Sequence, residues 1–233
     1  MPAKVLIIGD SHTIALHDGC DALGIGYHKV YGTGGAWFEG RYKFMQKRGL
    51  VSKPGPNRKK LLQLADEMGH SNIFDAGLPV IASFGFNFGK LLGALETWRH
   101  SIPDQKGCYD NDAEAVMSRG FAEEYVEALC GKNFRIIKNI ARIADVTMVV
   151  PPRADASHNR VQLTDIITQR MTDVGAKVFD PGRVFTKSRK KALPAKYLSE
   201  DQIHGTSDYG QKIVEQLVEL GALGSKLKLR KAA

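Results

Sequence analysis

Long apolar runs are missing from this sequence of 233 residues. No stretch approaches the roughly 18 uninterrupted apolar residues that suggest a membrane-spanning helix. The first apolar run, residues 5–8, stops at Gly9 and Asp10 and is too short for the apolar part of a secretory signal. We therefore expect a cytoplasmic protein, or a mature form from which a leader has been removed.

Cysteine and proline are also scarce. The three cysteines, Cys20, Cys108 and Cys130, are widely spaced, which supports neither a disulfide framework nor a cysteine-based metal site. The histidines show no H-E-x-x-H or similar ligand spacing, so we predict no catalytic metal and no cofactor. With 43% hydrophobic and 25% charged residues, the composition is that of a globular protein.

Negative charge is in deficit, because the formal net charge is +8. Basic residues gather in residues 41–60, 183–196 and 226–231, and such clusters can attract phosphates or anionic glycans. No RNA- or DNA-binding motif accompanies them, so a solvated surface with a loose basic tail is the simpler interpretation and nucleic acid is not the expected partner. The composition does not indicate an oligomeric state.

Short apolar runs alternate with helical patterns along the chain. We expect strands at residues 4–9, 25–31, 78–84, 146–150 and 177–180, and a turn at 32–35. Helices are expected over residues 11–23, 58–68, 90–99, 113–144 with a break near 130–133, 160–174 and 208–220. This alternation predicts one α/β domain, residues 1–223, with a mostly parallel five-stranded sheet and helices on both faces, followed by a basic tail from residue 224. Ligands of such folds bind beyond the carboxyl ends of the strands.

Two segments at that edge carry the residues of nucleophilic catalysis. Gly9-Asp-Ser-His-Thr13 follows the first strand and opens a helix, where the Ser11 hydroxyl would meet a helix N-terminus, although ordinary N-capping also selects such residues. Asp201 and His204 lie three residues apart before the last helix, so the carboxylate can orient an imidazole that takes a serine proton.

Two further strand ends offer donors for an oxyanion. Gly35, in the glycine-rich turn after the second strand, can present a bare backbone N–H, and the Asn87 side chain after the third strand can supply an amide. Each has a simpler explanation, since the glycines suit a turn and Asn87 suits a helix cap.

The ordered set Gly-Asp-Ser, Gly, Gly-x-Asn and Asp-x-x-His resembles the four blocks of the SGNH/GDSL hydrolases over most of the chain. The resemblance implies a flavodoxin-like three-layer α/β/α sandwich, Ser11 as nucleophile, and His204 with Asp201 as base and orienter. It further implies an oxyanion hole of Ser11, Gly35 and Asn87, with Gly34 the alternative glycine. The first block reads Gly-Asp-Ser-His rather than Gly-Asp-Ser-Leu, as in relatives that act on carbohydrate esters, and the third lacks the common Asp after Asn87.

The predicted function is therefore that of a serine esterase that removes or transfers a short acyl group, such as an O-acetyl group on a carbohydrate. His12, Gly34, Trp37 and Arg41 are candidate substrate contacts, with core packing the alternative for the tryptophan and a solvent-facing position the alternative for His12. Two other interpretations stay open: a non-catalytic carbohydrate-binding protein on the same fold, and a basic protein that binds nucleic acid or another anionic surface.

Overall fold

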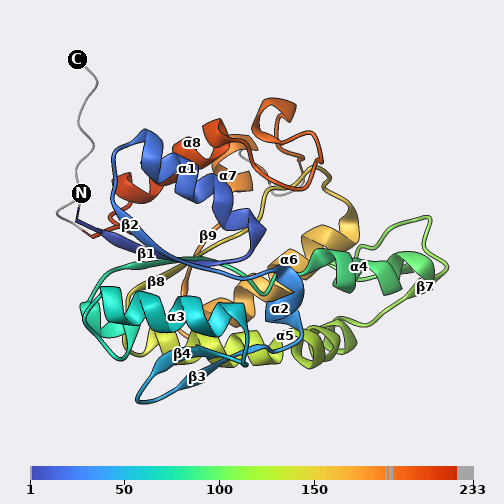
Figure 1. Ribbon diagram of the computed structural model, residues 1–233. Helices are drawn as coiled ribbons and strands as arrows, with labels where there is room; N and C mark the ends of the chain where they lie inside the picture. Colours follow the sequence, from blue (N-terminus) through green and yellow to red (C-terminus); the bar gives the residue numbers. More distant parts are fainter. Residues whose placement is uncertain (1, 187, 189–190, 225–233) are drawn as a thin grey trace.

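The computed structural model describes residues 2–186, 188 and 191–224, so the basic tail predicted from residue 224 lies outside the described residues apart from Gly224. A parallel five-stranded sheet with the order β2-β1-β5-β8-β9 runs through the centre of the molecule (Figure 1). Its strands are β1 Val5–Gly9, β2 Tyr27–Tyr31, β5 Val80–Ser83, β8 Val146–Val149 and β9 Lys177–Phe179.

Strand β1, which lies between β2 and β5, is buried along its whole length, as a continuous apolar run predicts. Because successive side chains point to opposite faces, Leu6 and Ile8 enter one hydrophobic core while Val5 and Ile7 enter the other. The sheet therefore separates two cores, and each must be covered by helices.

Helices cover both faces of the sheet, which gives three layers (Figure 1). One face carries α1 Ile14–Ala22, α7 Pro181–Thr186 and α8 Ser207–Glu219; the other carries α2 Gly34–Phe38, α3 Pro56–Glu67, α4 Phe88–Thr97, α5 Arg119–Ala141 and α6 His158–Asp173. The strand order is that of flavodoxin-like folds, so the predicted fold class is confirmed.

Smaller elements complete the chain. The 3₁₀ helices are η1 Ser11–Thr13, η2 Ile73–Ala76 and η3 Ala195–Tyr197, and two small sheets are formed by β3 Tyr42–Met45 with β4 Gly49–Ser52 and by β6 His100–Ser101 with β7 Ala115–Val116. Both small sheets escaped the sequence analysis. Within the described residues, no helix is both long and apolar enough to cross a membrane.

The long predicted helix differs from the structure at its start and in its middle. Helix α5 begins at Arg119, because Ser118 caps it by accepting a hydrogen bond from the Phe121 N–H, and residues 115–116 pair with β6 instead. The break predicted near residues 130–133 is wrong. Cys130 and Phe134 are buried in the core there, and this packing keeps the helix continuous across the glycine between them.

The segment predicted as a turn at residues 32–35 is half helical. Thr33 caps α2 by accepting from the Ala36 N–H at 3.1 Å, so Gly34 and Gly35 become the first two residues of a helix. Gly32 remains outside it, and a Cβ there would overlap the Tyr42 ring. The position of α2 after β2 places its N-terminus at the carboxyl edge of the sheet, the edge at which Ser11 follows β1 (Figure 1).

Helices α1 and α8 pack closely on each other through glycine. A Cβ on Gly210 of α8 would overlap the Ala15 carbonyl of α1, and a Cβ on Gly19 would overlap the backbone of Gly210. Each helix is preceded by a segment with catalytic residue types: Ser11 lies before α1, and Asp201 and His204 lie before α8. This crossing therefore brings Ser11, near the start of the chain, toward Asp201 and His204, near its end.

Candidate active site

Ser11 lies directly after β1, at the carboxyl edge of the sheet. Asp10 forms the N-cap of η1, where its Oδ1 accepts from the His12 N–H at 3.1 Å, and its carbonyl accepts from the Thr13 hydroxyl. The helical turn is therefore capped by Asp10 and not by Ser11, and the Ser11 hydroxyl is available for another partner.

The loop before α8 holds His204 through a compact set of hydrogen bonds. Leu198 and Gly205 pair across its base, and the Ser199 hydroxyl donates to Asp201 Oδ1 at 2.7 Å. The backbone N–H of His204 donates to the same oxygen at 3.0 Å, while Asp201 Oδ2 lies 2.5 Å from His204 Nδ1. The imidazole is therefore fixed by both its backbone and its ring.

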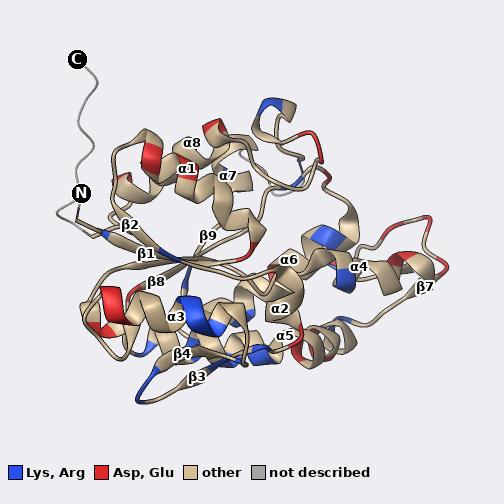
Figure 2. Cartoon of the chain, viewed as in Figure 1, with Lys and Arg blue, Asp and Glu red and all other residues tan. Residues whose placement is uncertain are grey.

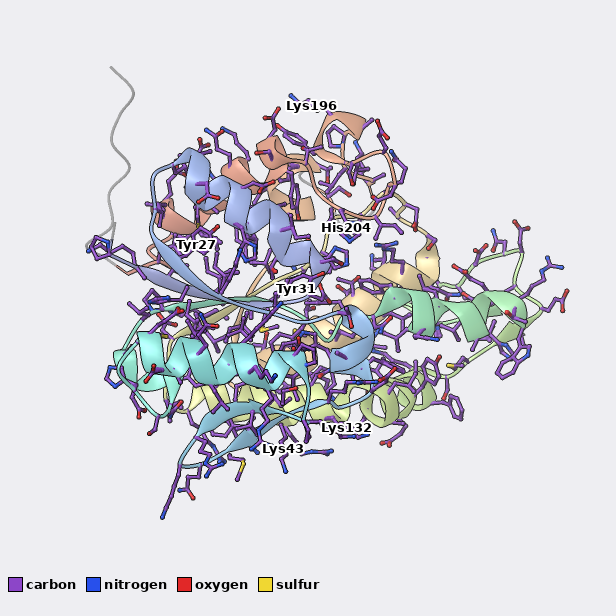
Figure 3. The ribbon with its side chains drawn as sticks, viewed as in Figure 1. Tyr27, Tyr31, Lys43, Lys132, Lys196 and His204 are labelled. Carbon is purple, nitrogen blue, oxygen red and sulfur yellow. The ribbon has the colours of Figure 1, made fainter. Side chains whose placement is uncertain are left out.

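The structure brings the two segments together. His204 Nε2 lies 2.7 Å from Ser11 Oγ, although the residues are 193 positions apart (Figure 3 shows His204 above the sheet edge). Since Asp201 accepts from Nδ1–H, Nε2 is free to accept the serine proton. This is the geometry of a Ser–His–Asp triad, with the His204 side chain 32% exposed and so open to a substrate.

Electrostatics favour the charge states that such a triad needs. Hydrogen bonds from the His204 side chain and from the backbone N–H groups of His204 and Ile203 hold the pKa of Asp201 well below its usual range. The carboxylate therefore stays ionised at neutral pH and can stabilise an imidazolium beside it.

His12 lies in the site rather than facing solvent. Its ring is 5.1 Å from that of His204, centroid to centroid, and its Nδ1 is buried with no hydrogen-bond partner among the described residues. Burial, followed by repulsion from the protonated form of His204 and from Arg160, lowers the pKa of His12 to about 4. At neutral pH it is an uncharged imidazole beside the His204 ring.

Arg160 was not singled out by the sequence. Its guanidinium donates to Asp155 Oδ2 at 3.0 Å and to the Pro152 carbonyl at 3.3 Å, and its Cζ lies 4.8 Å from the centroid of the Phe88 ring. This fixes a positive charge near His12 and beside the start of α4. No spacing rule points to Arg160, because its neighbours come from separate strand ends.

Asp10 was missed as a charged group in its own right. Its burial raises the pKa of the carboxyl to about 6, partly offset by the His12 N–H and the nearby His204. A Cβ on Gly34 would lie 3.7 Å from its Oδ2, so Asp10 also borders the glycines of α2. An acidic residue between a glycine and a serine at a strand end was the available signal.

The two glycines that begin α2 are not explained by packing. Neither has a positive φ, and a Cβ on Gly35 would approach other side chains no nearer than 4.0 Å. As the first two helical residues, both have N–H groups with no acceptor inside the helix. Glycine weakens a helix by about 1 kcal/mol relative to alanine. Because a methyl group would fit here, the presence of glycine needs an explanation other than helix stability or packing.

Asn87 holds the N-cap position of α4 without using its side chain as a cap. The Leu91 N–H donates to its carbonyl at 3.1 Å, but no backbone N–H donates to its side-chain oxygen. The capping explanation thus fails for the side chain, which remains half-buried at the carboxyl end of β5.

Two predicted substrate contacts lie elsewhere. Trp37 takes the core-packing alternative and not the substrate contact: it is 1% exposed and its ring is stacked between Tyr42 and Phe84, with centroid distances of 3.9 and 4.2 Å. Arg41 is exposed and pairs with Glu39 at 2.9 Å, so nothing ties it to the triad. Periodicity cannot separate a site aromatic from a core aromatic on so short a helix.

The triad residues do not line the groove of about 640 Å³ that runs along β2 and α3, so cavity volume does not identify this site. Among the described residues, no group of three or more His, Cys, Asp or Glu side chains is arranged to hold a metal ion. The site is thus recognised by its hydrogen bonds.

Comparison with known proteins gives likeness in structure only. No family model matches the sequence, and no curated protein matches it. An acetyl xylan esterase from the rumen bacterium Butyrivibrio proteoclasticus is 15% identical with a TM-score of 0.45, covering 95% of this chain and 66% of that longer one. A psychrotrophic esterase from Pseudoalteromonas is 14% identical with a TM-score of 0.43 (92% and 94% covered), and a GDSL-like lipase from Bacteroides thetaiotaomicron is 14% identical with a TM-score of 0.39 (94% and 86% covered).

Proposed function

We propose that this chain is a serine esterase of the SGNH/GDSL type, with Ser11 as the nucleophile. The observation that carries the proposal is the continuous hydrogen-bonded series from Ser11 Oγ to His204 Nε2, at 2.7 Å, and from His204 Nδ1 to Asp201. A surface His near an Asp has no reason to meet a serine 193 positions away at the carboxyl edge of a parallel sheet. A general base within hydrogen-bond reach of a hydroxyl is the arrangement that nucleophilic acyl transfer requires.

The mechanism has two halves. His204 takes the Ser11 proton as Oγ attacks the ester carbonyl, and the imidazolium beside Asp201 then gives that proton to the leaving alcohol as the acyl–oxygen bond breaks. Water, or a sugar hydroxyl in a transfer reaction, gives its proton to His204 and attacks the acyl-enzyme. The new ester or acid leaves as Ser11 recovers its proton.

The oxyanion of each tetrahedral intermediate needs donors that are already in position. We assign this role to the Ser11 backbone N–H, the Gly35 N–H and the Asn87 side-chain amide, with Gly34 as the alternative glycine. Support comes from the absence of any packing need for the glycines and from the uncommitted Asn87 side chain. Removing one such donor typically costs about 3 kcal/mol of transition-state stabilisation.

The proposed substrate is a short acyl ester, with an O-acetyl group on a carbohydrate as the specific proposal. The support is the Gly-Asp-Ser-His form of the first block, whose His12 ring lies against His204. An uncharged imidazole there can donate a hydrogen bond to the alcohol part of the ester or accept one from it. Because it carries no charge, it does not repel the imidazolium that His204 forms during the reaction.

A phosphonate probe tests the nucleophile directly. The protein is treated with an organophosphonate, the labelled peptide is identified by mass spectrometry, and hydrolysis of a short-chain nitrophenyl ester and of acetylated xylan is measured alongside. We expect label on Ser11 in the wild type, none in Ser11→Ala, strongly reduced label in His204→Ala, and unchanged label in Ser71→Ala, a control at an exposed serine. A folded wild type that takes no label and turns over no ester, yet binds carbohydrate equally well as Ser11→Ala, would point to the non-catalytic binding role.

A further inference from the structure

A basic face lies on the β3–β4 hairpin and the helices that flank it, where Figure 2 shows Lys and Arg at the hairpin and along α3. Its members are all exposed, and none of them forms an ion pair within the described residues. The basic face is defined as the following seven residues: Lys43, Lys47, Arg48, Lys53, Arg58, Lys132 and Arg135. Unpaired cations in one region create a positive potential that attracts anions.

A cleft of about 270 Å³ opens in this face, between the hairpin and α3. Its lining is largely aliphatic, with Leu50, Val51, Leu61, Leu62 and Ile73 among the apolar residues. It also includes two serines and four cations, Lys43, Arg48, Lys53 and Arg58. No acidic and no aromatic side chain lines it. The volume lies just below the range of about 300–1,000 Å³ that is usual for small-molecule sites, so it suits a slender apolar group.

Two apolar side chains of the cleft are unusually exposed. Leu62 on α3 is 59% exposed and Met45 at the end of β3 is 41% exposed. Single exposed apolar residues are common, but these two line the same cleft together with four cations. An apolar surface bordered by unpaired cations is matched by a ligand with an apolar tail and an anionic head.

We propose that this face binds anionic lipid at a membrane surface, with the head group among the cations and part of an acyl chain in the cleft. Lysine and arginine near an anionic bilayer each add to binding through the surface potential, and the aliphatic lining adds the burial of apolar area. A nucleic-acid partner is disfavoured because its bases would be expected to stack on aromatic side chains, and the cleft has none. The proposal does not depend on the esterase activity.

Vesicle flotation tests the charge requirement. The full chain is mixed with vesicles of phosphatidylcholine alone or of phosphatidylcholine with phosphatidylglycerol, at low and at high salt. We expect binding only to the anionic vesicles, weakened by salt, and reduced about tenfold or more in the triple variant Lys43→Glu/Arg48→Glu/Arg58→Glu. The control variant Lys106→Glu/Lys191→Glu/Lys196→Glu changes the net charge equally at exposed positions outside the face and should bind as the wild type does.

A second pair of variants tests the cleft. Leu62→Gln should weaken the binding that remains at high salt, whereas Leu220→Gln, at a leucine 69% exposed on the opposite layer, should leave it unchanged. Equal binding by the two triple variants would overturn the proposal. The proposal would also be overturned if the wild type did not bind anionic vesicles but bound single-stranded RNA, and if only the basic-face triple variant lost that RNA binding. The basic face would then be a nucleic-acid-binding surface.

Discussion

The half-buried imidazole of His12, whose Nδ1 is shielded from solvent, leads to a measurable prediction about stability and pH. Its pKa is lowered from 6.5 to about 4, chiefly by burial, so the folded protein takes up a proton at this ring far less readily than the unfolded chain does. Stability from the neutral ring is therefore present above pH 6.5 and is lost as the pH falls through the window down to about 4. Replacing the ring by an uncharged amide, in His12→Gln, removes this dependence.

The size of the effect follows from the two pKa values. Between pH 7 and pH 5, the shift from 6.5 to about 4 makes His12 protonation lower the free energy of unfolding by about 2 kcal/mol. Asp10 acts in the opposite direction, because its raised pKa of about 6 lowers stability as the pH rises from 4 to 6. His17, whose pKa burial also lowers to about 4, adds to the loss on acidification. Both contributions persist in His12→Gln and cancel in the comparison.

The assay is urea unfolding of the wild type and His12→Gln at pH 7 and pH 5, monitored by far-UV circular dichroism. We expect the drop in the free energy of unfolding between the two pH values to be about 2 kcal/mol larger for the wild type. His70→Gln, which removes an exposed histidine, is the control for the substitution itself. If the wild type and His12→Gln lose equal stability on acidification, His12 is not a desolvated ring beside His204 and the description of the site is wrong.

Three further predictions concern the site and its support. Gly210→Ala should overlap α1, lower the melting temperature by an amount that corresponds to about 1–3 kcal/mol, and reduce phosphonate labelling of Ser11, whereas Gly93→Ala, where a Cβ meets nothing within 4 Å, should do neither. Asn87→Ala should lower kcat about 10²–10³-fold in ester hydrolysis with an unchanged melting temperature, and an equal kcat would exclude it as an oxyanion donor. Gly35→Ala should keep or raise the melting temperature, because the methyl group has room and alanine favours a helix, while kcat falls; a fall with Gly34→Ala instead would make Gly34 the donor.

Most of the fold was predictable from two sequence features: the continuous apolar runs of the inner strands and the alternation of strands with helices along the chain. The strand at β1 is apolar throughout, and its Gly9 lies so close to Ser83 that a Cβ would overlap the neighbouring strand. The chain order of strands and helices then limits the topology to a few right-handed arrangements. The β3–β4 hairpin was not foreseen. Three residues, Gln46, Lys47 and Arg48, join its strands, and the available turn signal was Gly49, which has a φ of 63°. In the sequence, this segment stood out only as part of a basic cluster.

The residue types of the site were predictable, but their surroundings were not. Ser11, His204 and Asp201 stand out because one mechanism needs all three, each at a strand end or before the last helix. The place of Trp37 in the core depends on Tyr42 and Phe84, which reach it from separate elements. Contacts of this kind depend on tertiary packing, about which local sequence patterns carry little information.

The α1–α8 crossing explains how so distant a pair is held at hydrogen-bond distance. Ser11 and His204 each lie just before a helix, and those two helices meet at Gly19 and Gly210 without intervening side chains. A helix pair in such close contact cannot shift without overlap, so the distance between the serine hydroxyl and the imidazole is set by backbone packing. The loop hydrogen bonds to Asp201 then need only orient the ring. For this reason a methyl group on Gly210, which faces α1, should reduce phosphonate labelling of Ser11.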